Sequence, residues 1–381
     1  MDAVAVEDTL VYLGSSGSII ILNVSNPSSI QEISRVDTKG ESRELYLSPP
    51  YLYTADGGAG LGIINVSNPY SPRIMGYCEV PDAARGVALS GNYAYVAAKS
   101  QGLRVIDISN PSSPKEVGHC NTPGSAYGVT VSGNYAYLVN QHAGLRVIDI
   151  SNPISPKEVG YYDTPGYAYG VVVSKNYAYV ADFYEGLRII DVSNPSSPKE
   201  VSYWDTPGYA YRVKLSKNCA YVADGPKGLR MVGVGKPRNP VEMGYYDTEG
   251  NAKELAITDR YIYIADEYGG LSILEYYGPG IEEPSHSQAG DIEILPNPFS
   301  LKTVISYRLP LQSEVSLRIY NACGEPVKVF TKTRCQKSKT YVWDGRDNQN
   351  RRLPPGVYFL ELQSKGYRIT KKIILIDGLS Y

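Results

Sequence analysis

The chain has 381 residues, of which 37 are lysine or arginine and 39 are aspartate or glutamate, so its formal net charge is −2. A charge this close to zero excludes a global field that would draw the protein to nucleic acid or anionic lipid. Tyrosine supplies 35 aromatic residues against four phenylalanines and two tryptophans. With 37 glycines and 26 prolines for turns, this composition favours short strands over helices. No apolar run approaches the ~18 residues needed for a transmembrane segment.

The amino-terminal residues, Met1 to Asp8, are acidic and begin inside a strand pattern. They lack the basic region and the apolar segment of a signal peptide. We therefore expect either that such a segment was removed or that the sequence is a fragment.

Residues 1–279 carry one repeated unit. Its marker, a proline that mostly follows asparagine, recurs every 42 residues, at Pro27, Pro69, Pro111, Pro153, Pro195, Pro237 and Pro279. Four runs of about five to seven residues in each copy are bounded by Gly, Pro, Asn or Asp, which predicts four short antiparallel strands. Four-stranded units at this period are typical of propeller blades. The sequence therefore predicts an all-β fold with a seven-bladed β-propeller.

The copies differ in completeness at the ends of the repeat region. Seven innermost strands are readable, but only six outermost strands. We expect the last blade to stay three-stranded or to be closed by residues that this sequence lacks.

The side chains of the repeat read mainly as packing residues. In the second strand of the fifth copy, Tyr177 and Tyr179 share one face while Ala178 and Val180 share the other, so large faces can meet small faces between blades. A recurrent arginine on the third strand is expected to pair between blades rather than to bind a ligand; it is Arg104, Arg146, Arg188 and Arg230 in successive copies.

The repeat contains a specific sequence motif. Residues 102–111 read Gly-Leu-Arg-Val-Ile-Asp-Ile-Ser-Asn-Pro, and relatives of this segment recur in register. The pattern resembles the LVIVD repeat family of bacterial surface propellers. Copy six departs from it with Met231-Val-Gly-Val-Gly, and copy seven with Glu275-Tyr-Tyr-Gly. The resemblance implies a propeller that is secreted or held at the bacterial cell surface, but no agreed activity.

A second domain follows the repeats. Residues 280–290 read as a flexible linker, and residues 291–381 contain short alternating runs that predict a small sandwich. The markers Leu295-Pro-Asn-Pro-Phe299, Val315-Ser-Leu-Arg-Ile-Tyr320, Trp343-Asp-Gly-Arg-Asp347 and Gly356-Val-Tyr-Phe359 look like the Ig-like domain shared by flagellar hook-capping proteins and type IX secretion sorting tails. This resemblance implies an export and surface-attachment signal that contacts the secretion machinery.

Residues with metal or catalytic chemistry are sparse. The three histidines, His119, His142 and His286, lie outside every metal or triad motif, and the five cysteines show no CxxC spacing. Asp344, Asp347 and Asn350 have loose calcium-loop spacing, but the same residues suit a tight hairpin turn. We predict no catalytic residue, no metal site and no cofactor.

One ring of positions differs between copies although a propeller would bring its members together. The residue before each innermost strand is a tyrosine in blades four to six. In blades seven, one, two and three, charged residues occupy this position and, in some copies, the next one. Variable turns, including Gln141, Phe183, Tyr184 and Glu267, open on the same face. We predict a ligand site at this channel mouth, formed by Arg43, Glu44, Arg85, Tyr127, Tyr169, Tyr211, Lys253 and Glu254. The alternative is that the residues at these solvent-facing loop ends vary between copies without forming a site.

Three functions fit these observations. The first is a monomeric, non-catalytic binding module for an extracellular glycan, peptide or envelope component. The second is an extracellular hydrolase or lyase that uses Glu44 and Glu254 as paired carboxylates. The third is a structural envelope or adhesion protein.

Overall fold

The computed structural model describes residues 2–27, 29–275, 291–295, 297, 299–308, 314–321, 325–334, 338–364 and 367–376. The predicted linker, His286, Cys323 and Cys335 lie outside these residues. The described chain is all β apart from one short 3-10 helix, η1 (Glu267–Gly269), which confirms the predicted fold class. Its sheets divide between two compact units, one built from β1 to β26 and the other from β27 to β33.

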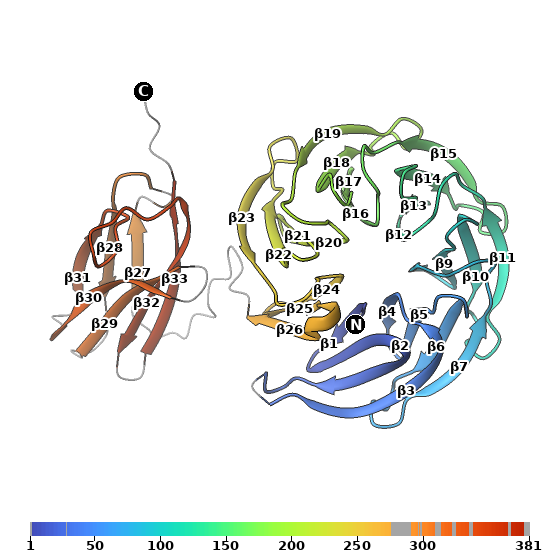
Figure 1. Cartoon of the computed structure of the whole chain (residues 1–381), viewed down its shortest axis with the longest axis horizontal. Helices are drawn as coiled ribbons and strands as arrows, with labels where there is room; N and C mark the ends of the chain where they lie inside the picture. The colour runs from blue at the N-terminus through green and yellow to red at the C-terminus, as the bar shows by residue number, and fades with distance from the viewer. Residues whose placement is uncertain are drawn as a thin grey trace. The chain divides into compact units, whose positions relative to one another are not determined.

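The first unit is a ring of seven sheets, each corresponding to one repeat (Figure 1). Neighbouring innermost strands contact one another all the way round, and the last of them, β24, contacts β1. The ring is therefore closed, as expected for a seven-bladed propeller. The strands are β1 (Ala3–Glu7), β2 (Leu10–Asn23), β3 (Gln31–Glu41), β4 (Glu44–Ser48), β5 (Tyr51–Ala55), β6 (Leu61–Asn65), β7 (Arg73–Cys78), β8 (Gly86–Ser90), β9 (Tyr93–Ala97), β10 (Leu103–Asp107), β11 (Lys115–Cys120), β12 (Gly128–Ser132), β13 (Tyr135–Val139), β14 (Leu145–Asp149), β15 (Lys157–Tyr162), β16 (Gly170–Ser174), β17 (Tyr177–Ala181), β18 (Leu187–Asp191), β19 (Lys199–Trp204), β20 (Arg212–Ser216), β21 (Cys219–Ala223), β22 (Leu229–Gly233), β23 (Val241–Tyr246), β24 (Glu254–Ile257), β25 (Tyr261–Ala265) and β26 (Leu271–Glu275).

The second to sixth blades have four strands each, in the order in which they occur along the chain. In the first blade, β2 serves as both the second and the third strand of the repeat, because Leu10–Gly14 pairs with β1 and Ser16–Asn23 pairs with β3. The seventh blade, β24 to β26, has three strands within the described residues.

Blades pack through the alternation that the sequence shows. Tyr179 of β17 is 4% exposed and shares one apolar cluster with Val213 and Val222 of the next blade. Ala178 and Val180, on the other face of the same strand, pack with Val139 and Val147 of the preceding blade. Burying one such aliphatic side chain contributes about 1.5–3 kcal/mol. Both faces of this sheet are therefore core.

The repeated proline has a structural role between blades. A Cβ at Gly160, on outer strand β15, would lie 2.2 Å from the carbonyl oxygen of Pro195 in the next blade. One blade further on, Ser202 takes the equivalent place, and its hydroxyl donates a hydrogen bond to the carbonyl oxygen of Pro237. Because the proline turn of each blade presses on the outer strand before it, this outer-strand position accepts only a small residue.

The recurrent arginines pair within their own blades, so the predicted pairing between blades is wrong. Arg146 of β14 contacts Glu158 at 3.5 Å and Asp163 at 2.6 Å, both at the adjacent outer strand β15. The strand register places Arg146 opposite Tyr161, and a bulge after Val147 brings Glu158 within reach.

The second unit consists of two sheets. One has the order β27-β28-β31 and the other has the order β30-β29-β32-β33. Side chains from both sheets, among them Ile305, Leu317, Trp343 and Leu360, share one buried core, so this unit is a small sandwich. The strands are β27 (Asp291–Leu295), β28 (Thr303–Arg308), β29 (Glu314–Tyr320), β30 (Pro326–Arg334), β31 (Ser338–Trp343), β32 (Gly356–Ser364) and β33 (Tyr367–Leu375).

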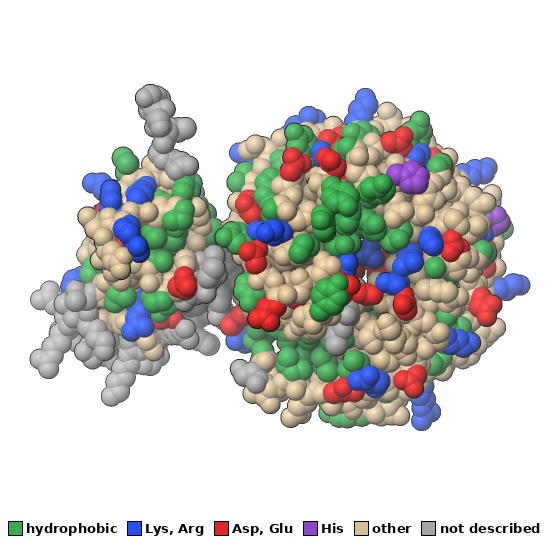
Figure 2. Space-filling view, viewed as in Figure 1, with side chains coloured by type: hydrophobic (Ala, Val, Ile, Leu, Met, Phe, Trp, Pro, Cys, Tyr) green, Lys and Arg blue, Asp and Glu red, His purple; other side chains and the backbone are tan. Residues whose placement is uncertain are grey.

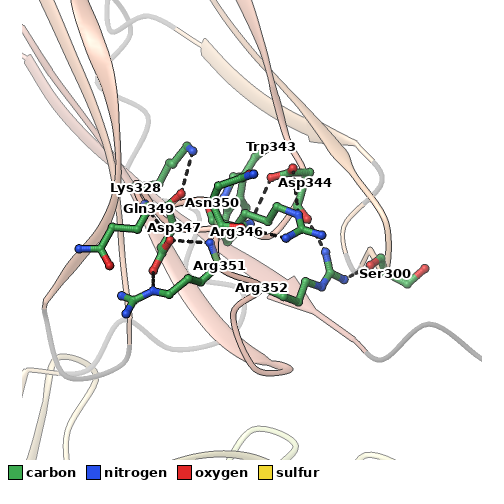
Figure 3. A network of polar contacts seen from close by, with 10 residues as sticks. All are labelled: Ser300, Lys328, Trp343, Asp344, Arg346, Asp347, Gln349, Asn350, Arg351 and Arg352. Atoms are coloured by element: carbon green, nitrogen blue, oxygen red, sulfur yellow. Dashed lines mark hydrogen bonds and ion pairs between the residues drawn. The ribbon is translucent and has the colours of Figure 1, made fainter.

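The turn after β31 holds the residues with calcium-loop spacing (Figure 3). One carboxylate oxygen of Asp347 accepts hydrogen bonds from the backbone N–H groups of Gln349 and Arg351, and the other accepts one from the Arg351 guanidinium. The Asp344 carboxylate accepts a bond from the backbone N–H of Arg346. These contacts are typical of a tight turn that is stabilised by its own side chains.

Candidate functional site

A cluster of seven aromatic side chains lies at the channel mouth, and we call it the aromatic cluster. Phe183 is its centre. Its ring stacks on Tyr209, with centroids 4.8 Å apart and an interplanar angle of 27°, and meets Tyr184 edge-on at 4.3 Å. Edge-to-face and offset geometries at these distances are the favourable ones for aromatic pairs. The members are Tyr127, Tyr167, Tyr169, Phe183, Tyr184, Tyr209 and Tyr211.

A backbone bridge between blades brings these rings together. Phe183 lies in the turn between β17 and β18, and it pairs with Ala210, just before β20 of the next blade. Tyr209 and Tyr211 flank that alanine, so both rings reach Phe183. The same bridge joins Gln141 to Ala168 one blade earlier, which places Gln141 beside Tyr169. The Gln141 amide donates a hydrogen bond to the Tyr169 hydroxyl at 3.2 Å.

The backbone at Phe183 is strained. Its φ is +53°, a left-handed conformation that favours glycine. Equivalent turns in the second and sixth blades carry Gly57 and Gly225 with φ of +54° and +57°. Non-glycine residues also hold this place in the third, fourth and seventh blades, with φ of +41° to +44°, so the fold imposes the conformation and Phe183 adopts it at a cost in strain.

The cluster is open to solvent on one side. Tyr184 is 58% exposed, Tyr167 43% and Tyr209 38%, whereas Tyr127, Tyr169 and Tyr211 are half-buried nearer the channel. Burial raises the pKa of Tyr169, so its hydroxyl stays protonated. Figure 2 shows a hydrophobic patch on this face beside the central opening, over the blade of β16 to β18, with basic side chains next to it.

Two cations stack on the half-buried tyrosines. The Lys253 ammonium lies 3.8 Å from the centroid of Tyr211, and the Arg85 guanidinium lies 5.3 Å from that of Tyr127. Both contacts have cation–π geometry. Lys253 also forms an ion pair with Glu267 at 3.7 Å. A continuous row thus runs from Arg85 of the third blade to Lys253 of the seventh.

The two glutamates predicted at the mouth lie in the channel wall, where both bind one arginine. Arg212 of β20 donates from Nε to Glu254 at 2.8 Å and from Nη2 to Glu44 at 3.1 Å. Its Nη1 donates to the carbonyl oxygen of Tyr169 at 2.7 Å. Glu254 also faces Lys214 at 3.6 Å. We call this set of ion pairs the Arg212 brace.

Burial dominates the electrostatics of the brace. It raises the pKa of Glu44, although Arg212 and the backbone N–H of Val87 favour the ionised form. Burial would lower the pKa of Arg212, but Glu44 and Glu254 together raise it. The arginine therefore stays charged and lies between the carboxylates.

The predicted site residues thus separate into three groups. Tyr127, Tyr169 and Tyr211 join the aromatic cluster, with Arg85 and Lys253 stacked beside it. Glu44 and Glu254 belong to the Arg212 brace. Arg43 pairs instead with Asp2 at 3.0 Å and with Glu41.

Some residues of the aromatic cluster and of the Arg212 brace are not among the predicted site residues. Tyr167 and Tyr209 precede Tyr169 and Tyr211 by two residues, a spacing that places them on the same side of an extended segment. Phe183 and Tyr184 stand in a turn whose sequence varies between copies, and Arg212 occupies one of the ring positions that vary. The spacing and the variability were therefore the available signals.

Among the described residues, no group of three or more His, Cys, Asp or Glu side chains is arranged to hold a metal ion. Nor does this part of the chain contain a helix of the length and hydropathy required to span a membrane.

The tail and the fold have recognisable relatives. Residues 293–376 match the secretion system C-terminal sorting domain, which marks the protein as secreted or displayed at the cell surface by the type IX route. PorZ, described as an essential bacterial surface component of the type-IX secretion system of Porphyromonas gingivalis, is similar at 13% identity and a TM-score of 0.56, over 98% of this chain and 59% of that one. U3-55K is similar at 11% identity and a TM-score of 0.61, over 72% of this chain and 94% of that one. At these identities the likeness shows the fold alone, and no curated protein matches significantly.

The propeller has the most extensive match. Seven consecutive stretches match the LVIVD repeat, at residues 2–38, 39–80, 82–122, 123–164, 165–206, 207–248 and 249–275. Since these stretches cover most of the sequence, the chain belongs to the LVIVD repeat family.

Proposed function

We propose that this protein is a non-catalytic, glycan-binding module whose aromatic cluster holds an extracellular sugar chain. The observation that carries the proposal is the exposure of Tyr184, Tyr167 and Tyr209 around a strained, half-buried Phe183. Single exposed tyrosines are ordinary on a protein surface, but a mutually packed set is a mark of a binding surface.

The geometry favours a sugar over the other extracellular ligands considered. The C–H faces of a pyranose ring pack on aromatic faces, while its hydroxyls need hydrogen-bonding groups at the rim. The Tyr169 hydroxyl, the Gln141 amide and the Asn251 amide lie around the cluster. Rigid aromatic rings also lose little conformational entropy on binding.

The carboxylate enzyme is the weaker alternative. General acid and base pairs need carboxylates that face the substrate. Glu44 and Glu254 face Arg212 instead, and Glu254 is only 2% exposed.

We assign the propeller to residues 1–279, the linker to 280–290 and an Ig-like sorting domain to 291–381. In this assignment the tail engages the type IX machinery and delivers a monomeric propeller to the outside of the cell. Size-exclusion chromatography with light scattering of the full chain tests the monomer, and a dimer mass contradicts it.

The test of the glycan site is an oligosaccharide array probed with the full chain and three variants. Tyr184→Ala and Tyr209→Ala should each weaken glycan binding at least about tenfold, while the melting temperature changes little because both rings are surface residues. Tyr70→Ala is the matched control. Tyr70 is 69% exposed, in the turn between β6 and β7, which lies at the opposite end of the blade from the mouth. Glycan binding that survives both cluster substitutions, or no binding to any glycan, contradicts the proposal.

A further inference from the structure

This inference rests on the glycan site proposed above and concerns the charge of the glycan. We propose that the glycan is acidic, with carboxylate-bearing sugars, and that Arg85 binds a sugar carboxylate at the edge of the aromatic cluster.

Arg85 differs from most of the basic side chains around the mouth. Among the described residues it forms no ion pair, and its Nε is buried without a hydrogen-bond partner. By contrast, the neighbouring cations have acidic partners: Arg43 with Asp2, Lys99 with Asp82, Arg212 with Glu254 and Lys253 with Glu267. A planar guanidinium presents paired donors that match a carboxylate, so Arg85 retains the means to bind one.

The position of Arg85 places this charge next to the stacking surface. Its guanidinium lies over Tyr127, and Tyr127 meets Tyr169 at 4.8 Å within the cluster. A sugar packed on the rings beside Tyr127 would therefore lie next to the Arg85 guanidinium.

A second cation stands at the other end of the cluster. Lys227 is exposed in the turn between β21 and β22, two residues after Gly225, and it forms no ion pair among the described residues. A Cβ at Gly225 would lie 3.2 Å from the ring of Tyr211 and 3.3 Å from the Cβ of Tyr209, so this turn adjoins the cluster. Unpaired cations on the third and sixth blades fit a chain with more than one acidic sugar.

The test compares uronate oligosaccharides as free acids with the same oligosaccharides as methyl esters, titrated against the full chain by calorimetry. The ester keeps the ring and its hydroxyls but removes the charge. We expect the free acid to bind at least about tenfold more tightly, with an advantage that shrinks as salt rises. Arg85→Gln should weaken binding of the free acid much more than binding of the ester and so remove most of this advantage. Arg73→Gln, which changes an exposed arginine on outer strand β7, is the matched control.

The outcomes separate the two proposals. Equal affinity for acid and ester, or an acid preference that Arg85→Gln does not alter, overturns the acidic-ligand inference while the glycan site stands. Binding of neither form, together with a glycan array that stays empty, overturns the glycan site itself. If Arg85→Gln unfolds, Arg85→Lys retains the charge without the planar fork and should keep only part of the preference.

Discussion

Arg212 donates hydrogen bonds to Glu254 of the next blade and to Glu44, 168 residues earlier in the chain. Glu254 belongs to the seventh blade and Glu44 to the second, so the brace links the end of the repeat array to its beginning across the channel. The first and seventh blades belong to separate sheets, and β1 contacts β24 without pairing with it in the described structure. Ring closure in the described structure therefore depends on apolar packing together with this brace.

Replacing Arg212 should destabilise the propeller strongly. Arg212→Met leaves two carboxylates buried without their cation, and breaking a buried ion pair in this way costs about 3–5 kcal/mol. Chemical denaturation of the full chain measures the loss. The triple variant Arg212→Met, Glu44→Leu, Glu254→Leu should recover most of it, because no buried charge then lacks a partner, and Lys214, which loses Glu254, is 41% exposed to water. A triple variant no more stable than the single variant would show that the brace is not the source of the loss.

The stability of the propeller should depend on pH in an unusual direction. Burial raises the pKa of both Asp182 and Asp224 to about 6, although the Thr164 hydroxyl hydrogen-bonds the ionised form of Asp182 and the backbone N–H of Gly208 that of Asp224. Between the ordinary aspartate pKa near 4 and about 6, the folded state therefore binds protons that the unfolded chain has released. These two aspartates therefore make stability fall as pH rises through this window, and their contribution is restored on acidification towards pH 4.

The chain contains its own control for this effect. The fourth blade carries Asn140 at the equivalent position, where its amide donates to Thr122 and to the carbonyl oxygen of Pro123. We expect the double variant Asp182→Asn, Asp224→Asn to flatten the change in denaturation midpoint between pH 4 and 6. An unchanged slope would assign the pH dependence to other carboxyls.

The strain at Phe183 predicts a reversed order of two substitutions. Phe183→Gly should be more stable than Phe183→Ala by about 1 kcal/mol, because glycine adopts a φ of +53° without cost. Both should bind glycan at least about tenfold more weakly, since each removes the central ring. At Tyr184, which is not among the residues with positive φ, alanine should be the more stable replacement. Denaturation midpoints of the four variants measure both differences in stability. If Phe183→Ala is more stable than Phe183→Gly, the backbone at Phe183 is not strained.

The sequence predicts the ring better than it predicts the site. The 42-residue period and the alternation at Tyr177 to Val180 give the blades, because strand faces follow a period of two whatever the neighbours. The ring of residues before the inner strands likewise gives Tyr127, Tyr169 and Tyr211. The sequence does not show which distant residues a long side chain contacts. Arg212 extends across the channel to Glu44, and this contact turns a predicted pair of mouth carboxylates into a buried brace.

The turn after β31 offers a last prediction, for the sorting domain alone. The carboxylate of Asp347 accepts bonds from two backbone N–H groups and from Arg351, and its pKa is lowered chiefly by the backbone bond from Arg351. Its contribution to stability is therefore present above the ordinary aspartate pKa near 4 and is lost only as pH falls through the lower pKa of the folded state. Asp347→Ala should lower the melting transition of the tail at pH 7 and leave that of the propeller in place, which calorimetry of the full chain resolves. Asp344→Ala, which removes one backbone hydrogen bond and an exposed ion pair with Arg346, is the milder control. If the two substitutions lower the transition equally, Asp347 is not the main latch of the turn; if neither does, the turn is not held by these carboxylates.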